Sequence, residues 1–205
     1  MNGHTFTYSG NDVYSLCGFV ENSGTMTING SGGTIVSDEV GLNSKEGVLN
    51  VNDATIKANR IGIYNKGTEL KEAVLKLKNV TFENCGTDVQ LGSNGTIDLS
   101  EYNGNAITID IDYNINDGKK HRISPRGVSR DDLNKIKFVR NSDKLYRVDL
   151  RYDEEGQYIY LAKHVHKWNY VLDNSDESGK TIKGYCSEEE RNNECDYQDP
   201  DTTTA

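Results

Sequence analysis

The sequence predicts an all-β protein whose first half is a short right-handed parallel β-helix. Two observations carry this prediction. Short apolar–polar alternations recur at steps of 23, 26 and 22 residues, and each repeat ends in an Asn-, Gly-, Ser- or Asp-rich corner. Such periodic strands are typical of solenoids, in which each coil stacks on the one before. In such a stack of coils only every second strand residue faces inward and must be apolar. This suits a chain that is 34% hydrophobic.

Each repeat of about 22 residues is expected to contain three strands. The first strand carries paired apolar positions, which are Met26/Ile28, Leu49/Val51, Leu75/Leu77 and Ile97/Leu99. The other two strands supply two more inward columns, one of Ile35, Ile56 and Phe82, the other of Cys17, Val40, Ile61 and Val89. The 26-residue step is explained by a loop at Lys66–Glu72. An antiparallel sandwich is the alternative arrangement for short, evenly spaced strands.

The periodicity changes after residue 101, so we divide the chain into four parts. These are coils at 1–101, a capping β segment with one short helix at 102–163, a small β-module at 164–198 and a linker at 199–205. Within the cap, Ile107–Ile111 alternates as a strand, and Ser129 is the expected N-cap of a short helix that ends near Lys137. Further strands are expected at 137–140, 145–152 and 157–162, the last two joined by a hairpin turn.

Residues 18–100 resemble the β-helix repeats of Gram-positive secreted and cell-surface proteins. The likeness rests on Gly47–Ile56, followed by Gly62-Ile63-Tyr64-Asn65, and on Leu75–Asn84. It implies the architecture of that family more strongly than an activity, because adhesins, lyases and passive stalks share such repeats. Residues from His164 to Cys195 resemble a short surface-protein module with the pattern H-x-H-x-W-x-Y, then I-x-x-x-C, then C.

The C-terminal module also contains the most specific candidate for a chemical site. His164, His166, Cys186 and Cys195 form a two-His, two-Cys set that could bind zinc as a tetrahedral site. Two other states of the cysteines stay open, namely a disulfide between Cys186 and Cys195 or a pair of thiols. Cys17 and Cys85 are not expected to form a disulfide, because about three coils would separate them.

No catalytic constellation is recognisable, and we predict no enzymatic activity. Asp110 and Asp112 share one face of a strand, but no basic partner is identified. The outward columns of Asn50, Lys76 and Asp98, and of Asn52, Lys78 and Ser100, mix charges without clustering acids. Seven tyrosines are candidates for an aromatic, sugar-facing patch, although packing on the sheet surface is the favoured role for most of them: Tyr64, Tyr102, Tyr113, Tyr146, Tyr152, Tyr158 and Tyr160.

The charge of −9 is concentrated at the end of the chain, where residues 173–201 hold ten acidic and three basic residues. The rest is nearly balanced, so a nucleic-acid partner is not expected, and no segment is apolar enough to insert into a membrane. The sequence and its resemblances therefore predict an extracellular, cell-surface binding or display scaffold, adhesin-like, that contacts glycan or protein on a host or neighbouring cell. The sequence has no recognisable signal peptide or anchor. The alternative is a polysaccharide lyase or glycoside hydrolase of the β-helix type, or its non-catalytic remnant.

Overall fold

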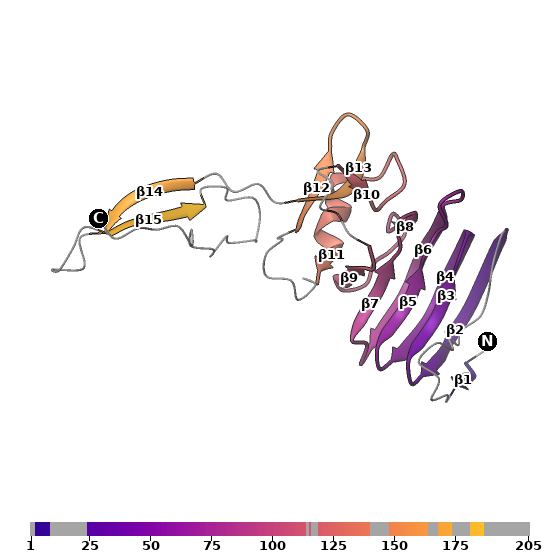
Figure 1. Ribbon diagram of the computed structural model, residues 1–205. Helices are drawn as coiled ribbons and strands as arrows, with labels where there is room; N and C mark the ends of the chain where they lie inside the picture. The colour runs from indigo at the N-terminus through magenta and orange to yellow at the C-terminus, as the bar shows by residue number, and fades with distance from the viewer. Residues whose placement is uncertain are drawn as a thin grey trace. The chain divides into compact units, whose positions relative to one another are not determined.

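The structure, a computed structural model, describes residues 3–8, 24–113, 115, 119–139, 148–163, 168–173 and 181–186. The chain divides into two compact units, Met1–Lys163 and His164–Ala205. The first unit contains a parallel β-solenoid of about four turns and a small antiparallel sheet, and the second contains a β-hairpin (Figure 1). The fold class predicted from the sequence, a short parallel β-helix, is confirmed.

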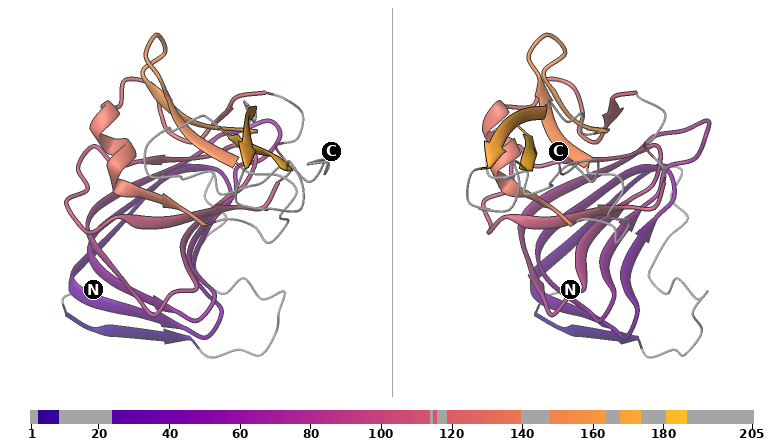
Figure 2. Two further views of the ribbon diagram at one scale, coloured as in Figure 1. Left: turned by 90° about the vertical axis from the view of Figure 1, so that its left-hand side faces the viewer. Right: turned by 60° about the vertical axis from the view of Figure 1, so that its left-hand side comes forward.

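Two parallel sheets form the walls of the solenoid. Sheet A contains, in spatial order, β1 (Thr5–Tyr8), β2 (Thr25–Ser37), β4 (Gly47–Ala58), β6 (Ala73–Glu83) and β8 (Gly95–Asp98). Sheet B contains β11 (Ile136–Phe138), β9 (Ile107–Ile111), β7 (Thr87–Leu91), β5 (Ile61–Asn65) and β3 (Val40–Ser44). The strands of successive coils lie over one another in the left view of Figure 2.

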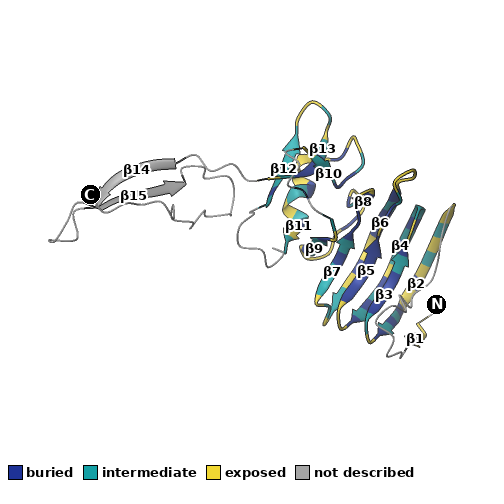
Figure 3. Ribbon diagram, viewed as in Figure 1, coloured by how far each residue is buried: buried dark blue, intermediate teal, exposed yellow. Residues whose placement is uncertain are grey.

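The first two predicted columns are confirmed by the strand register. Met26 pairs with Leu49, Leu49 with Leu75, and Leu75 with Ile97, as the repeat steps predict. The second column is formed by the consecutive partners Ile35, Ile56 and Phe82. These columns line the inside of the solenoid, where Leu75 and Ile56 are fully buried, and buried positions follow one another from coil to coil in Figure 3.

In β2, β4 and β6, the first two predicted strands of the coil are one long, bent strand. The bend lies at Ser31, Asp53 and Asn79, whose φ angles are 48°, 51° and 50°. Asp and Asn adopt this left-handed conformation more readily than most residues. Asn79 Nδ2 also donates to Asp53 Oδ1 over 2.8 Å, so the corner of one coil is hydrogen-bonded to that of the next.

The third predicted column is wrong by two residues at β7. Val40 pairs with Ile61 as expected, but Ile61 pairs with Thr87, and Val89 pairs with Ile63. Val89 and Ile63 belong to the main core, whereas Val40 and Ile61 form a small separate cluster with one tyrosine. Cys17, the first expected member of this column, lies outside the described residues.

The capping segment extends the solenoid and then covers its end. Strands β9 and β11 continue sheet B, and the expected short helix is a 3₁₀ helix, η1 (Arg130–Lys135), with Ser129 as its N-cap. A third sheet, sheet C, contains β10 (His121–Arg122), β13 (Tyr158–Lys163) and β12 (Val148–Asp153) in antiparallel order. Apolar residues from this segment, which include Ile123, Ile159 and Leu161, belong to the same hydrophobic core as the coils.

The second unit contains a hairpin of β14 (Trp168–Asp173) and β15 (Thr181–Cys186). Its strands are antiparallel, and Trp168 is the register partner of Cys186. The first strand is described from Trp168 onward, because His164 and His166 lie outside the described residues.

Candidate binding surface

The seven tyrosines proposed for a sugar-facing patch do not share one exposed surface. Tyr146 lies outside the described residues. Five others are buried or packed against the core, and they are Tyr64, Tyr102, Tyr113, Tyr152 and Tyr160. Tyr158 is half-buried, as Tyr113 and Tyr152 are, but unlike them it does not pack against the hydrophobic core. The part of the proposed patch that is free of the core is therefore the neighbourhood of Tyr158.

Two of the buried tyrosines have hydroxyl groups that serve the structure. Tyr64 donates to the carboxylate of Asp112, and burial together with this bond raises the pKa of Tyr64. Tyr102 donates to the backbone oxygen of Asn105 over 2.9 Å. Burial, with the nearby charge of Asp88, raises the pKa of Tyr102 to about 12. A buried hydroxyl needs such a partner, so these contacts account for both side chains without a ligand.

Tyr158 and Tyr160 lie on the outer face of sheet C. Residues alternate between the two faces of a strand, and Ile159 and Leu161 of β13 face the core. The two tyrosine rings meet edge to face, with their centroids 6.0 Å apart. Such an aromatic pair forms a rigid, partly polar contact surface.

Cations lie over both of these rings. The Nζ atom of Lys120 is 4.9 Å from the centroid of Tyr160, and the Cζ atom of Arg126 is 5.2 Å from the centroid of Tyr158. These distances are within the range of cation–π attraction. Lys120, Arg126, Tyr158 and Tyr160, with the flanking Arg122 and Arg151 described next, are called the cap face below.

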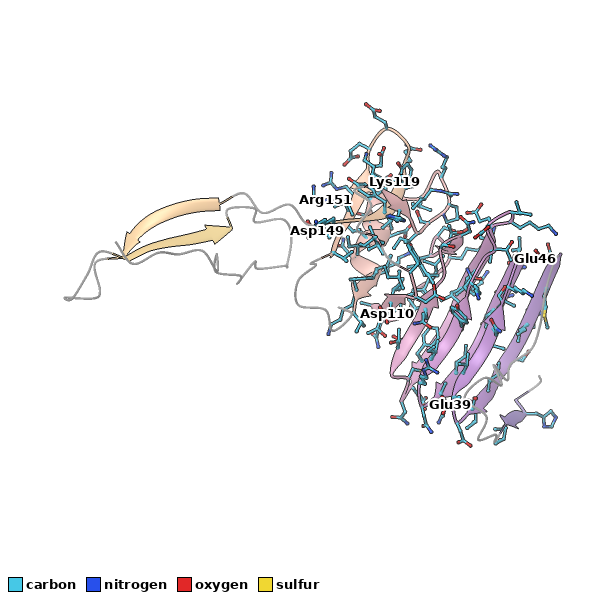
Figure 4. The ribbon with its side chains drawn as sticks, viewed as in Figure 1. Glu39, Glu46, Asp110, Lys119, Asp149 and Arg151 are labelled. Carbon is cyan, nitrogen blue, oxygen red and sulfur yellow. The ribbon has the colours of Figure 1, made fainter. Side chains whose placement is uncertain are left out.

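Arg122 and Arg151 are the register partners of Tyr160 on its two sides. Three of the four cations on the cap face are paired with acids. Arg122 lies 3.0 Å from Glu72, Lys120 lies 2.6 Å from Asp153, and Arg151 lies 2.9 Å from Asp149. Figure 4 shows Arg151 and Asp149 side by side on this sheet.

Lys120 and Asp153 shift each other's pKa in opposite directions. The hydrogen bond from Lys120, together with one from the backbone of Gly156, lowers the pKa of Asp153 to about 2. The same bond raises the pKa of Lys120. Both groups are therefore ionised at neutral pH, and each neutralises the other on the cap face.

A local charge count would have shown from the sequence that the capping segment is basic. Residues 119–163 contain 12 Lys and Arg against 7 Asp and Glu, a net charge of +5. The remaining 11 basic and 25 acidic residues give −14, which returns the total of −9. Summing charge over residues 1–172 hides this excess, because the acidic coils cancel the basic cap.

The outer face of sheet A has a different character, because its polar groups satisfy one another along the axis. Asn50 Nδ2 donates to Thr27 Oγ1 over 3.0 Å, and Asn52 Nδ2 donates to Asn29 Oδ1 over 2.9 Å. These ladders connect neighbouring coils, so they stabilise the stack.

The charged residues of sheet A's outer face are also paired. Lys76 lies 3.6 Å from Asp98, and Lys78 lies 2.9 Å from Glu101. Burial works against ionisation of Asp98, but hydrogen bonds from Ser100 and the charge of Lys76 outweigh burial and lower the pKa of Asp98. These charged side chains of the outward columns therefore form ion pairs that join neighbouring coils.

The expected loop at Lys66–Glu72 is confirmed as an insertion between β5 and β6. Thr68 and Lys71 exchange two backbone hydrogen bonds of 2.8 and 3.2 Å, which makes a tight turn with Leu70 at its tip. Leu70 is 94% exposed, the only large hydrophobic residue so exposed in the described part of the chain. Glu72 at the base of the loop connects it to Arg122 of the cap face.

The proposed metal and disulfide residues are not placed by the structure. His164, His166 and Cys195 lie outside the described residues, and the side chain of Cys186 at the end of β15 is not described either. The zinc site and the disulfide stay predictions. Within the described ranges, no group of three or more His, Cys, Asp and Glu side chains is arranged to hold a metal ion.

Comparisons of this chain with protein-family models, with curated proteins and with solved structures give no match. Among the described residues, no helix has the length and apolar character needed to cross a membrane. A functional assignment must therefore come from the fold and from the cap face.

Proposed function

We propose that the chain is an extracellular, cell-surface binding and display scaffold, and that it binds glycan through the cap face. The observation that carries the proposal is the pair of tyrosines on sheet C, of which Tyr158 is half-exposed and lies beside an exposed arginine. Tyrosine and arginine, together with tryptophan, are enriched among the side chains that dominate binding energy at protein–protein interfaces. A sugar ring has an apolar face that packs on an aromatic ring and hydroxyl groups that accept hydrogen bonds from arginine.

The stack of coils supports the display part of this proposal. Inward columns that repeat from coil to coil and outward ladders that join neighbouring coils make a rigid element. A binding surface mounted on such an element is held in a fixed geometry, which lowers the entropy lost when a ligand binds. No chemistry beyond recognition is assigned to the cap face.

A glycan array probed with the full chain tests this proposal. We expect retention of at least one glycan class, and a loss of at least about tenfold in affinity for Tyr158→Ala, equal to about 1.4 kcal/mol. The control is Thr81→Ala, an exposed change on sheet A that should leave binding unchanged. Equal binding by both variants, or no binding by the natural chain, would contradict the proposal. Shortening of a bound polysaccharide would favour the lyase or hydrolase alternative instead.

A further inference from the structure

Arg126 differs from the other cations of the cap face. Lys120, Arg122 and Arg151 each pair with a carboxylate, whereas no described carboxylate lies within ion-pair distance of Arg126. The side chain of Arg126 is exposed, and its contact is with the ring of Tyr158. Among the described residues of the cap face, Arg126 is therefore the cation whose charge is not neutralised by an acid.

The backbone holds Arg126 in this position. The N–H groups of Gly127 and Val128 both donate to the backbone oxygen of Gln157, over 2.9 and 3.1 Å. Gly127 has a φ of 81° and Gln157 a φ of 49°, so both turns use the left-handed region. A Cβ on Gly156 would overlap the ring of Tyr158 and lie 3.1 Å from Nη1 of Arg126. The side chains of Arg126 and Tyr158 therefore pack against the backbone at Gly156, and this packing limits their movement.

A guanidinium that lies over an aromatic ring keeps N–H donors with which it can bind a carboxylate. The group has five N–H donors in a planar fork, and a carboxylate can accept two of them at once. The adjacent half-exposed ring of Tyr158 supplies an apolar surface on which a sugar ring can pack. One cation and one ring side by side match a sugar that carries one acid group.

The neighbouring acids limit how densely the ligand can be charged. Asp153, Glu154 and Glu72 lie on or beside the cap face, and each is paired with one of its cations or with Arg130. A nucleic acid, with a negative charge at about every 1.7 Å of duplex, would meet these acids as well as Arg126.

We propose that the ligand of the cap face is a glycan whose carboxylates are spaced at least one neutral sugar apart, with one carboxylate bound by Arg126 and its sugar packed against Tyr158. This inference rests on the proposed function, because it names the class of glycan that the same surface binds.

Isothermal titration calorimetry on the full chain tests the inference. The probes are a decasaccharide of alternating glucuronate and N-acetylglucosamine, the same decasaccharide with its carboxyl groups methyl-esterified, and a single-stranded decanucleotide. We expect the acidic decasaccharide to bind at least about tenfold more tightly than the ester. Arg126→Gln should remove this difference, so that the variant binds the acidic and esterified forms with equal affinity. Arg60→Gln is the matched control, an exposed arginine of the coils that lies 4.0 Å from Glu39, and it should change nothing.

Each remaining outcome decides against the inference in a recognisable way. Equal binding of the acidic and esterified forms, both weakened by Tyr158→Ala, would overturn the carboxylate site and leave the proposed glycan binding intact. If neither form binds but the array retains another glycan, the carboxylate site is overturned and the proposed glycan binding stays intact. Failure of every glycan would overturn both proposals. Tighter binding of the decanucleotide than of the acidic saccharide would show that the cap face is a nucleic-acid surface.

Discussion

Gly62 lies against Phe82 so closely that a Cβ on Gly62 would come within 2.8 Å of Cδ1 of the ring. The same Cβ would lie 2.6 Å from the backbone oxygen of Asp88 in the next coil. Gly41, one coil earlier, has the equivalent relationship with Ile56, whose Cγ2 would be 2.9 Å away. Because Gly41 and Gly62 have no side chain, sheet B can approach the inward column of sheet A that contains Ile56 and Phe82.

Gly62→Ala should destabilise the solenoid by about 1–3 kcal/mol, because the added methyl overpacks the core. Urea denaturation measures this change as a lower midpoint with an unchanged slope. Phe82→Leu alone removes core volume and is also expected to destabilise. The combined variant should lose less than the sum of the two single losses, since the smaller side chain makes room for the methyl. Simple additivity would contradict this packing.

Leu75 and Lys76 are sequence neighbours with opposite environments, so they test the strand register. Leu75 is fully buried between Leu49 and Ile97, and Lys76 is exposed beside Asp98. Leu75→Asp places an unpaired charge in the core and should remove several kcal/mol of stability. Lys76→Gln removes one partly exposed ion pair and should cost about 1 kcal/mol or less. Similar losses for the two variants would contradict the register.

The sequence predicts the first two columns well because apolar residues mark both of them in every coil. In the third column, Val89 was aligned with Ile61 because both are apolar, but Thr87 occupies that position. The register follows a constant corner length instead: four positions separate Lys57 from Ile61 and also Glu83 from Thr87. A slip of two residues keeps every side chain on the same face, so an alternating pattern cannot reveal it.

The cap face was only partly predictable. Tyr158 and Tyr160 were among the candidates, but alternation alone could not separate them from tyrosines such as Tyr64 that are buried by distant residues. Arg122 is brought beside Tyr160 by β10, a strand of two residues that is too short to give a sequence pattern. Pairings between distant residues thus decide which tyrosines solvent can reach.

Asp110 gives a prediction about pH. Burial raises the pKa of the Asp110 carboxyl, the bond from the Ile111 N–H works against burial, and the charge of Asp112 adds to the rise. A carboxyl with a higher pKa in the folded state than in the unfolded state loses stabilising free energy as pH rises through that range. Asp110→Asn should therefore raise stability at pH 7 and not at pH 3, because asparagine keeps an acceptor for Ile111. Thermal unfolding at both pH values measures the effect, and a destabilised variant at pH 7 would contradict it.

The C-terminal module gives a prediction that separates its two proposed cross-links. If His164, His166, Cys186 and Cys195 bind zinc, a chelator should lower the unfolding temperature of this module and leave the solenoid transition in place. If Cys186 and Cys195 form a disulfide, a reductant should do so and the chelator should have no effect. Calorimetry on the full chain, with an elemental zinc analysis, distinguishes these cases. A module that responds to neither reagent would contradict both.

The most direct test of the account is a map of where a glycan from the array contacts the chain. Two-dimensional amide NMR spectra of the full chain, recorded with and without that glycan, report contact residue by residue. We predict that the largest shifts fall on Arg126, Gly127, Gly156 and Tyr158, with the amides of Thr55 and Thr81 on sheet A unchanged. Shifts concentrated on the outer face of sheet A, with the cap face unchanged, would contradict the assignment of the binding surface.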